Sequence, residues 1–268
     1  MARRLLLALP ILLALCGVGR ATPGVIETQI AARGNGAPRR LTVILPPGYG
    51  AHGRRYPVLY LMDGQNLLSH PFYPGGWRAD TGLAEAVRSG VSEPMIIVGV
   101  HAQDRTHELT PVPDPKHGGG GAAQMVEHLV DDVIPYVEQH FAARTGSRDR
   151  AIGGSSLGGL FALHTLLTRK DVFSRGLVLS PSVWWAHRAI LADVARSATI
   201  GQQRVVLYNG GDQDGRANAE RLRDLLAHKG LVFEQSLFHW TEPDAGHDEP
   251  SWARFLPRGL GKLFPAAP

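Results

Sequence analysis

The sequence predicts an α/β fold in which helices cover both faces of a mostly parallel central sheet. Short apolar runs of strand-forming residues, bounded by Pro and Gly, alternate along the chain with segments of helical periodicity. This alternation is typical of a parallel sheet because each connecting helix packs against one face of it. The expected strands are, in order, 41–45, 58–61, 95–100, 176–179, 205–208 and 233–240.

Three longer segments have the periodicity of amphipathic helices. They cover residues 124–141, 218–229 and 250–264, and Gly230 is a typical stop for the second. At the N-terminal end, residues 26–31 and 41–45 have the pattern of a β-hairpin. We therefore expect the sheet to be mixed, with an antiparallel edge at its N-terminal side.

The first 21 residues have the three-part pattern of a secretory signal peptide. Arg3 and Arg4 precede an apolar run over residues 5–15, and small residues follow at Gly19-Arg20-Ala21. The apolar run is about 11 residues long, shorter than the ~20 that a spanning helix needs. We expect export to the periplasm or beyond the cell, with residues 22–268 as a single catalytic domain. An uncleaved anchor, a lipid anchor at Cys16 and a twin-arginine signal are the alternatives.

Charge and cysteine content exclude several classes of protein. The formal net charge of +4 includes Arg3, Arg4 and Arg20, three positive charges, so residues 22–268 carry a net charge of +1. This balance gives no indication of a nucleic-acid partner. Cys16 is the single cysteine, so a chain cleaved after residue 21 has neither a disulfide nor a cysteine nucleophile.

One segment, residues 110–122, combines three prolines with a run of four glycines. A long loop of this composition inside an α/β domain is either a functional lid or a flexible connection. We expect flexibility because the segment has few side chains able to grip a ligand.

The strongest chemical motif is a nucleophile elbow. Gly154-Ser155-Ser156-Leu157-Gly158 fits G-x-S-x-G, at a point where a further strand ends and a helix with apolar residues from Leu160 onward begins. Glycines are needed on both sides because the nucleophile sits on a sharp turn against the neighbouring strand and helix. The motif predicts the α/β-hydrolase fold, with Ser156 as nucleophile. A structural glycine-rich turn is the alternative interpretation.

A serine hydroxyl needs a neighbouring base, and in this fold the partners follow in the order Ser, acid, His. Asp212 and Asp214 both lie in the loop after the strand at 205–208, and we favour Asp214. Turn formation or helix capping is the alternative role for either residue. His247 lies between the last strand and the last helix, where the base belongs. His239, within the last strand pattern, is the nearest rival among 12 histidines.

Acyl transfer also needs donors for the oxyanion that develops on the carbonyl oxygen. The backbone N–H of Leu157, directly after the nucleophile, is one expected donor. The backbone N–H of Gln65, in the loop after the strand at 58–61, is the other. A simple β-turn on Asp63-Gly64 is compatible with this role. His101 and His107 lie near another strand end, where they are candidates to line the pocket.

Five strings together resemble the putative-esterase family. They are LMDGQN (61–66), IGGSSLGGLFAL (152–163), SPSVWW (180–185), GGDQDG (210–215) and GHDEPSW (246–252). That family includes enterobactin and bacillibactin esterases, feruloyl and acetylxylan esterases, S-formylglutathione hydrolases and secreted mycolyltransferases, and the resemblance runs from about Leu41 to Phe264. The family often has G-x-x-E where this chain has Gly211-Asp212-Gln213-Asp214, which favours Asp214 with Asp in place of Glu. The family's DG turn likewise implies Gln65 as an oxyanion donor.

Together with the signal-peptide pattern of residues 1–21, the resemblance implies an exported serine carboxylic-ester hydrolase that forms an acyl-enzyme and acts on a small-molecule ester. SPSVWW is most similar to the siderophore esterases, so a siderophore or aryl ester is the expected substrate. Trp184 and Trp185 either wall an aromatic pocket or pack in the core. The histidine and acid spacings predict no metal, and no motif predicts a cofactor. An acyltransferase of the same fold and a non-catalytic binding protein are the alternatives.

Overall fold

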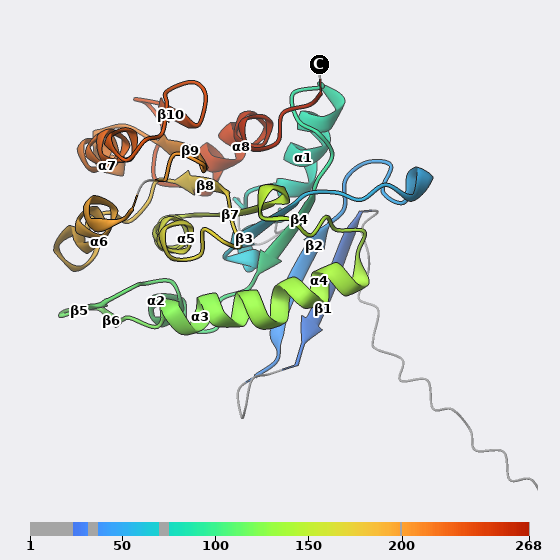
Figure 1. The fold of residues 1–268 in the computed structure, drawn as a ribbon, viewed down its shortest axis with the longest axis horizontal. Helices are drawn as coiled ribbons and strands as arrows, with labels where there is room; N and C mark the ends of the chain where they lie inside the picture. Colours follow the sequence, from blue (N-terminus) through green and yellow to red (C-terminus); the bar gives the residue numbers. More distant parts are fainter. Residues whose placement is uncertain (1–23, 32–36, 70–74, 199, 268) are drawn as a thin grey trace, which may run out of the picture.

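The computed structural model describes residues 24–31, 37–69, 75–198 and 200–267. Eight strands form one sheet in the order β1-β2-β4-β3-β7-β8-β9-β10 (Figure 1). Their bounds are β1 Val25–Ile30, β2 Arg39–Ile44, β3 Val58–Met62, β4 Ile96–Val100, β7 Arg150–Ser155, β8 Arg175–Leu179, β9 Arg204–Asn209 and β10 Leu237–Thr241. The predicted signal peptide lies outside the described residues.

The sheet is mixed at one edge and parallel elsewhere. β2 is antiparallel to both β1 and β4, whereas every pair from β4 to β10 is parallel. The expected antiparallel N-terminal edge and the mostly parallel sheet are therefore confirmed. In a parallel sheet all strands end at the same edge, so the loops after β3, β7, β9 and β10 open on one side of the molecule.

Helices cover both faces of the sheet (Figure 1). Alternate residues of each strand face opposite sides, so β3 places Leu59 and Leu61 in a core with α1 and α8. Tyr60 and Met62 enter the opposite core, which the other long helices complete. The bounds are α1 Ala79–Arg88, α2 Arg105–Glu108, α3 Ala122–His128, α4 Ile134–His140, α5 Leu157–Thr168, α6 Trp185–Arg196, α7 Arg216–His228 and α8 Glu249–Leu263.

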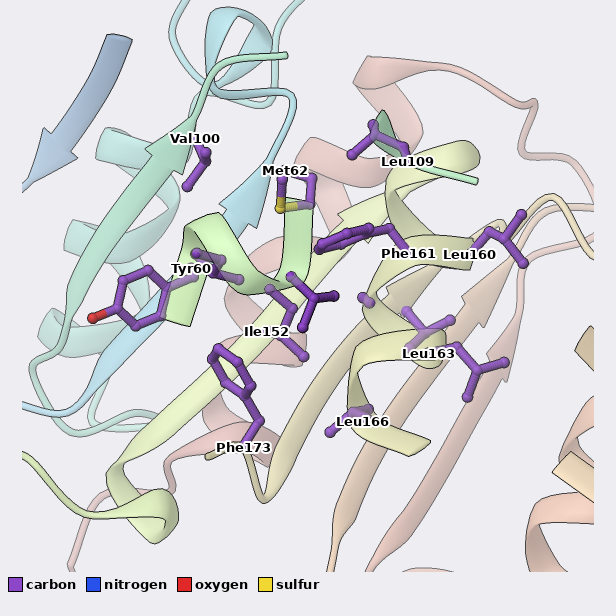
Figure 2. Close-up of a cluster of buried hydrophobic side chains, with 14 of the residues drawn as sticks. Tyr60, Met62, Val100, Leu109, Ile152, Leu160, Phe161, Leu163, Leu166 and Phe173 are labelled. Carbon is purple, nitrogen blue, oxygen red and sulfur yellow. The ribbon is translucent and has the colours of Figure 1, made fainter. Parts of the chain in front are cut away.

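α5 packs deeply against the centre of the sheet. The core that contains Tyr60 and Met62 also holds Phe161 and Ile152 (Figure 2). In it the Tyr60 and Phe173 rings pack edge to face, with their centroids 6.0 Å apart. Most residues of α5 are buried, so both its position and the direction of its N-terminus are fixed. This packing determines where the turn between β7 and α5 lies.

Two expected elements differ from the structure in detail. The expected helix at 124–141 is α3 and α4 joined by a π-helical turn, η3 Leu129–Val133. The last strand begins at Leu237, because the carbonyl of Val232 accepts hydrogen bonds from three following amides and holds that segment in a turn. The described residues also form four single 3-10 turns: η1 Ala51–Gly53, η2 Gly64–Asn66, η4 Ser147–Asp149 and η5 Asp212–Asp214.

The expectation of a flexible segment at residues 110–122 is wrong. The segment contains a short hairpin, β5 Pro113–Asp114 with β6 Gly118–Gly119. Trp185 Nε1 donates to the Val112 carbonyl at 2.8 Å, and the Gly120 amide donates to Thr110 Oγ1 at 2.8 Å. The prolines and glycines thus form a tight turn that is tied to its surroundings rather than a loose loop.

The structure also bears on membrane insertion. Within the described ranges, no helix has the length and apolar character needed to cross a membrane.

Candidate active site

Ser156 occupies the turn between β7 and α5. Its backbone has φ 57° and ψ −119°, a conformation that a non-glycine residue adopts only under constraint. A Cβ on Gly154 would lie 2.6 Å from the Gly158 carbonyl carbon, and one on Gly159 would lie 2.9 Å from the Leu179 carbonyl oxygen. The glycines therefore allow the close approach of strand and helix that produces this turn.

His247 and Asp214 form a hydrogen-bonded pair between Nδ1 and Oδ1. The Asp214 side chain is fully buried, whereas 42% of the His247 side chain is exposed. The Gly210 amide also donates to Asp214, at Oδ2. Asp212 is exposed on the same turn. The structure thus brings Asp214, rather than Asp212, to the predicted base.

The start of α8 fixes the position of His247. Asp248 is the N-cap residue of this helix, and its Oδ1 accepts a hydrogen bond of 2.9 Å from the Ser251 amide. Hydrogen bonds from Ser251 lower the pKa of Asp248, which favours the charged cap. The His247 ring lies edge to face against the Trp252 ring, with centroids 5.2 Å apart. The imidazole is therefore held on one side by a carboxylate and on another by an indole.

The Ser156 hydroxyl lies at the same edge of the sheet as this pair. Ser156 follows β7, Asp214 follows β9 and His247 follows β10. In the described part of the chain no hydrogen bond joins Ser156 to His247. Ser156 Oγ instead shares one of 3.2 Å with Ser182 Oγ. Catalytic hydrogen bonds are often long without substrate and shorten in the complex, so this geometry is compatible with acyl transfer.

The two predicted oxyanion donors follow neighbouring strands, Gln65 after β3 and Leu157 after β7. Leu157 is the first residue of α5, so its amide has no acceptor within the helix. Gln65 lies in the middle of η2, and Asp63, which precedes this turn, has a left-handed φ of 60°. A Cβ on Gly64 would lie 2.5 Å from the Gly99 carbonyl carbon, so this turn is pressed tightly onto β4.

An ion pair that the sequence analysis missed stabilises the Gln65 turn. Arg105 Nε lies 2.9 Å from Asp63 Oδ1, and its Nη2 lies 2.9 Å from Oδ2. Gln65 Nε2 donates to the same carboxylate at 3.0 Å. A single arginine in a loop has no distinctive sequence pattern, so only the fold identifies this contact.

The two tryptophans of SPSVWW differ in exposure. Trp184 is 51% exposed and lies near the β5–β6 hairpin, with its ring centroid 5.7 Å from that of His117. Trp185 is only 3% exposed, and its Nε1 donates to Val112. Trp184 is accessible to a ligand, whereas Trp185 packs beneath it and is not.

The other histidines considered from the sequence have different surroundings. His239 bonds to Asn209, and His101 bonds to Thr42. Burial, with nearby arginines, lowers the pKa of each to about 4, so both are neutral at pH 7. His107 lines a separate cavity of about 370 Å³ beside α3. We therefore find no contact of these rings with Ser156 or Asp214 among the described residues.

A larger cavity, of about 780 Å³, lies between α1 and α8. Arg78, Glu85 and Arg254 are among its lining residues, whereas Ser156, Asp214 and His247 are not. The chemistry of acyl transfer depends on the groups at the sheet edge, so we place the candidate site there and not in this cavity.

Comparison with known proteins assigns the family. Residues 34–263 match the family described as "Putative esterase". The chain belongs to the putative esterase family. This member is 24% identical to the uncharacterized protein YbbA of Bacillus subtilis, over 70% of this chain and 74% of that one. It is 31% identical to the siderophore enterobactin esterase of Emericella nidulans, over 63% of this chain and 61% of that one.

Solved structures agree on the fold of this esterase-family chain. The BES protein of Bacillus cereus superimposes with a TM-score of 0.73, at 20% identity, over 94% of this chain and 98% of that one. At this identity the likeness shows the fold, and together with the mostly parallel sheet it confirms the predicted α/β-hydrolase fold. The chain spans less than two thirds of the length of the Emericella relative.

Proposed function

We propose that this protein is a serine carboxylic-ester hydrolase with Ser156 as nucleophile, His247 as general base and Asp214 as the acid that orients His247. The observation that carries the proposal is the buried Asp214 carboxylate hydrogen-bonded to His247 Nδ1 at the sheet edge where Ser156 occupies a strained elbow. Membership of the putative esterase family supports the same chemistry.

The proposed reaction has two steps. Ser156 Oγ attacks the ester carbonyl carbon while His247 Nε2 takes the hydroxyl proton, and His247 then gives that proton to the leaving alcohol. Water next attacks the acyl-enzyme, again losing a proton to His247, and the acid is released as Ser156 regains its proton. Asp214 favours the tautomer with the proton on Nδ1 and stabilises the positive charge that His247 acquires.

The amides of Leu157 and Gln65 are proposed to stabilise the tetrahedral oxyanion. The N-terminus of α5 adds a favourable dipole, since Leu157 is its first residue. The Asp63–Arg105 ion pair supports the turn that presents Gln65. Donors held in place before the reaction need no rearrangement when the charge develops, which is the source of their effect on rate.

For the substrate we propose an ester with an aromatic part, and a catecholate siderophore ester in particular. The exposed Trp184 ring, beside His117, offers an apolar and aromatic surface next to the SPSVWW corner. The name of the Emericella relative, a siderophore enterobactin esterase, supports this choice. We also propose export, on the pattern of residues 1–21, which an N-terminus found near residue 22 in the mature protein would support.

The first experiment is labelling of the purified protein with a fluorophosphonate probe, which reacts with activated serines. We expect the wild type to be labelled and Ser156→Ala and His247→Ala to be unlabelled. A folded wild-type protein that takes up no probe contradicts the serine mechanism and favours a binding protein.

A substrate screen then tests the ester class. Turnover of a catecholate trilactone together with p-nitrophenyl acetate supports the siderophore proposal. Turnover of p-nitrophenyl acetate alone identifies a general esterase. Products in which an added alcohol replaces water identify the acyltransferase.

A further inference from the structure

The strand order places the corner after β8 between the candidate nucleophile and the candidate acid. β8 lies between β7 and β9, with Leu179 opposite Ser155 on one side and Tyr208 on the other. Ser180 follows Leu179 directly, so it emerges at the same edge as Ser156 and Asp214. Ser180 takes no direct part in the proposed two-step reaction.

Ser180 is 2% exposed and makes two side-chain hydrogen bonds. Its Oγ donates to Asp214 Oδ2 at 2.5 Å and accepts from Trp252 Nε1 at 2.9 Å. An indole N–H can only donate, so Ser180 Oγ must accept from Trp252. The single hydroxyl proton is thereby left for the carboxylate. Trp252 and Ser180 form a directed relay that ends on the oxygen of Asp214 that His247 does not use.

Ser180 makes these hydrogen bonds in an unfavourable backbone conformation, which its neighbours stabilise. Ser180 has a left-handed φ of 41°. Its amide donates to the Tyr208 carbonyl at 2.7 Å, and the neighbouring Pro181 Cα would lie 3.2 Å from a Cβ on Gly159. A non-glycine residue in this region persists only where its neighbours determine its conformation, and such positions gather at functional sites.

Trp252 contacts His247 directly and Asp214 through Ser180. Through its N–H it reaches Ser180 and hence Asp214, and through its ring it lies 5.2 Å from the His247 ring. It is buried on the first turns of α8, the helix that Asp248 caps immediately after His247. One residue therefore limits rotation of both the carboxylate and the imidazole.

We propose that Ser180 and Trp252 are positioning residues that hold Asp214, and through it His247, in the orientation for acyl transfer. This inference rests on the proposed function for its effect on rate, whereas its effect on the Asp214–His247 hydrogen bond does not depend on turnover. Misplacement of a catalytic group by about 1 Å costs on the order of 10²-fold in rate.

The test compares Ser180→Ala, Ser180→Gly and Trp252→Phe in the whole protein, with Ser92→Ala as control. Ser92 is also 2% exposed and bonds to the Phe264 carbonyl, away from the sheet edge that carries Ser156. For p-nitrophenyl acetate, Ser180→Ala should lower kcat by about 10²-fold with KM within about twofold. Trp252→Phe should cause a smaller loss. Ser92→Ala should change stability and leave kcat unaltered.

The Ser180→Gly variant separates the effect of the hydroxyl group on kcat from the effect of the backbone conformation. Glycine accepts the left-handed φ of Ser180 without strain but supplies no donor. We expect Ser180→Gly to be as slow as Ser180→Ala. A wild-type kcat in Ser180→Gly would overturn the proposal. It would show that the reaction needs the backbone conformation at residue 180 and not the hydrogen bond from the Ser180 hydroxyl to Asp214. If Ser180→Ala fails to fold, Trp252→Phe tests the same relay with Ser180 intact.

A spectroscopic measurement keeps the two proposals apart. The proton shared by His247 Nδ1 and Asp214 should give a far-downfield proton NMR signal, assigned by its absence in His247→Gln. This signal should shift or broaden in Ser180→Ala and Trp252→Phe and stay in place in Ser92→Ala. If the signal responds in this way but no ester is turned over, the proposed esterase activity is contradicted and the positioning role stands. If the signal does not move in Ser180→Ala, the positioning role is overturned.

Discussion

Asp214 and His247 lie 33 residues apart in the sequence, yet Oδ1 of one is hydrogen-bonded to Nδ1 of the other. The carboxylate is completely buried and the imidazole is partly open to solvent. This combination fits a fixed acid and a base that a substrate can reach, because a buried carboxylate keeps its interaction with the imidazole unscreened by water.

The first prediction compares the two aspartates of this turn. Asp214→Asn should lower kcat by about 10⁴-fold, since an amide can stabilise the wrong tautomer of His247 and cannot neutralise its positive charge. Asp212→Asn is the matched control, because Asp212 is exposed on the same 3-10 turn. Steady-state kinetics on p-nitrophenyl acetate measure both. Equal losses in the two variants would contradict the assignment of the acid.

The second prediction concerns the strain stored at the elbow. Ser156 has a φ of 57° and ψ of −119°, which glycine adopts readily and serine only with strain. Ser156→Gly should therefore raise the free energy of unfolding by about 1 kcal/mol while abolishing fluorophosphonate labelling. Urea unfolding measures the first effect and gel fluorescence the second. Ser156→Ala, which keeps a Cβ, should abolish labelling without this gain, and equal stability of the two variants would show that the turn is not strained.

The third prediction separates the adjacent tryptophans. Trp184→Ala should raise KM for aryl esters and change the melting temperature little, because about half of this side chain is exposed. Trp185→Ala should destabilise the protein by about 3–5 kcal/mol, the usual cost of removing a buried large aromatic side chain. The paired measurements are KM for an aryl and an alkyl ester and the free energy of unfolding. An unchanged aryl KM in Trp184→Ala would remove this ring from the substrate site.

Much of the fold could be predicted because local patterns determine it. The strand cores are continuous apolar runs, and the sharp elbow at Ser156 needs glycines that are visible in the sequence. The short hairpin at Pro113–Gly119 was missed for the opposite reason. Proline and glycine favour both a loose loop and a tight turn, and the contacts that decide between them come from Thr110 and Trp185, outside the hairpin.

The supporting contacts of the candidate site were beyond sequence reasoning for a related reason. Ser180 and Trp252 are 72 residues apart, and Asp63 and Arg105 are 42 apart. The first pair depends on the packing of α8 beside β8, and the second on β3 and β4 being neighbours in the sheet. Neither leaves a spacing pattern in the sequence. The order β7-β8-β9 is what brings Ser180 to Asp214. The candidate catalytic side chains are marked by local motifs, whereas the side chains proposed to position them are marked only by topology.

The last prediction concerns acid stability and depends on two histidines outside the candidate catalytic set. Burial, with Arg40 and Arg39 near His101, lowers its pKa from 6.5 to about 4, and burial with Arg223 does the same for His239. Between pH 6.5 and about 4 the unfolded chain binds protons at these positions and the native chain does not. Native stability is therefore fully present above pH 6.5 and falls as the pH is lowered toward 4.

Urea unfolding between pH 7.5 and 4.5 should show this decline. His239→Gln keeps an amide donor for Asn209 but cannot titrate, so its stability should fall less steeply over the same range. Parallel curves for the wild type and His239→Gln would mean that His239 does not contribute to the acid sensitivity.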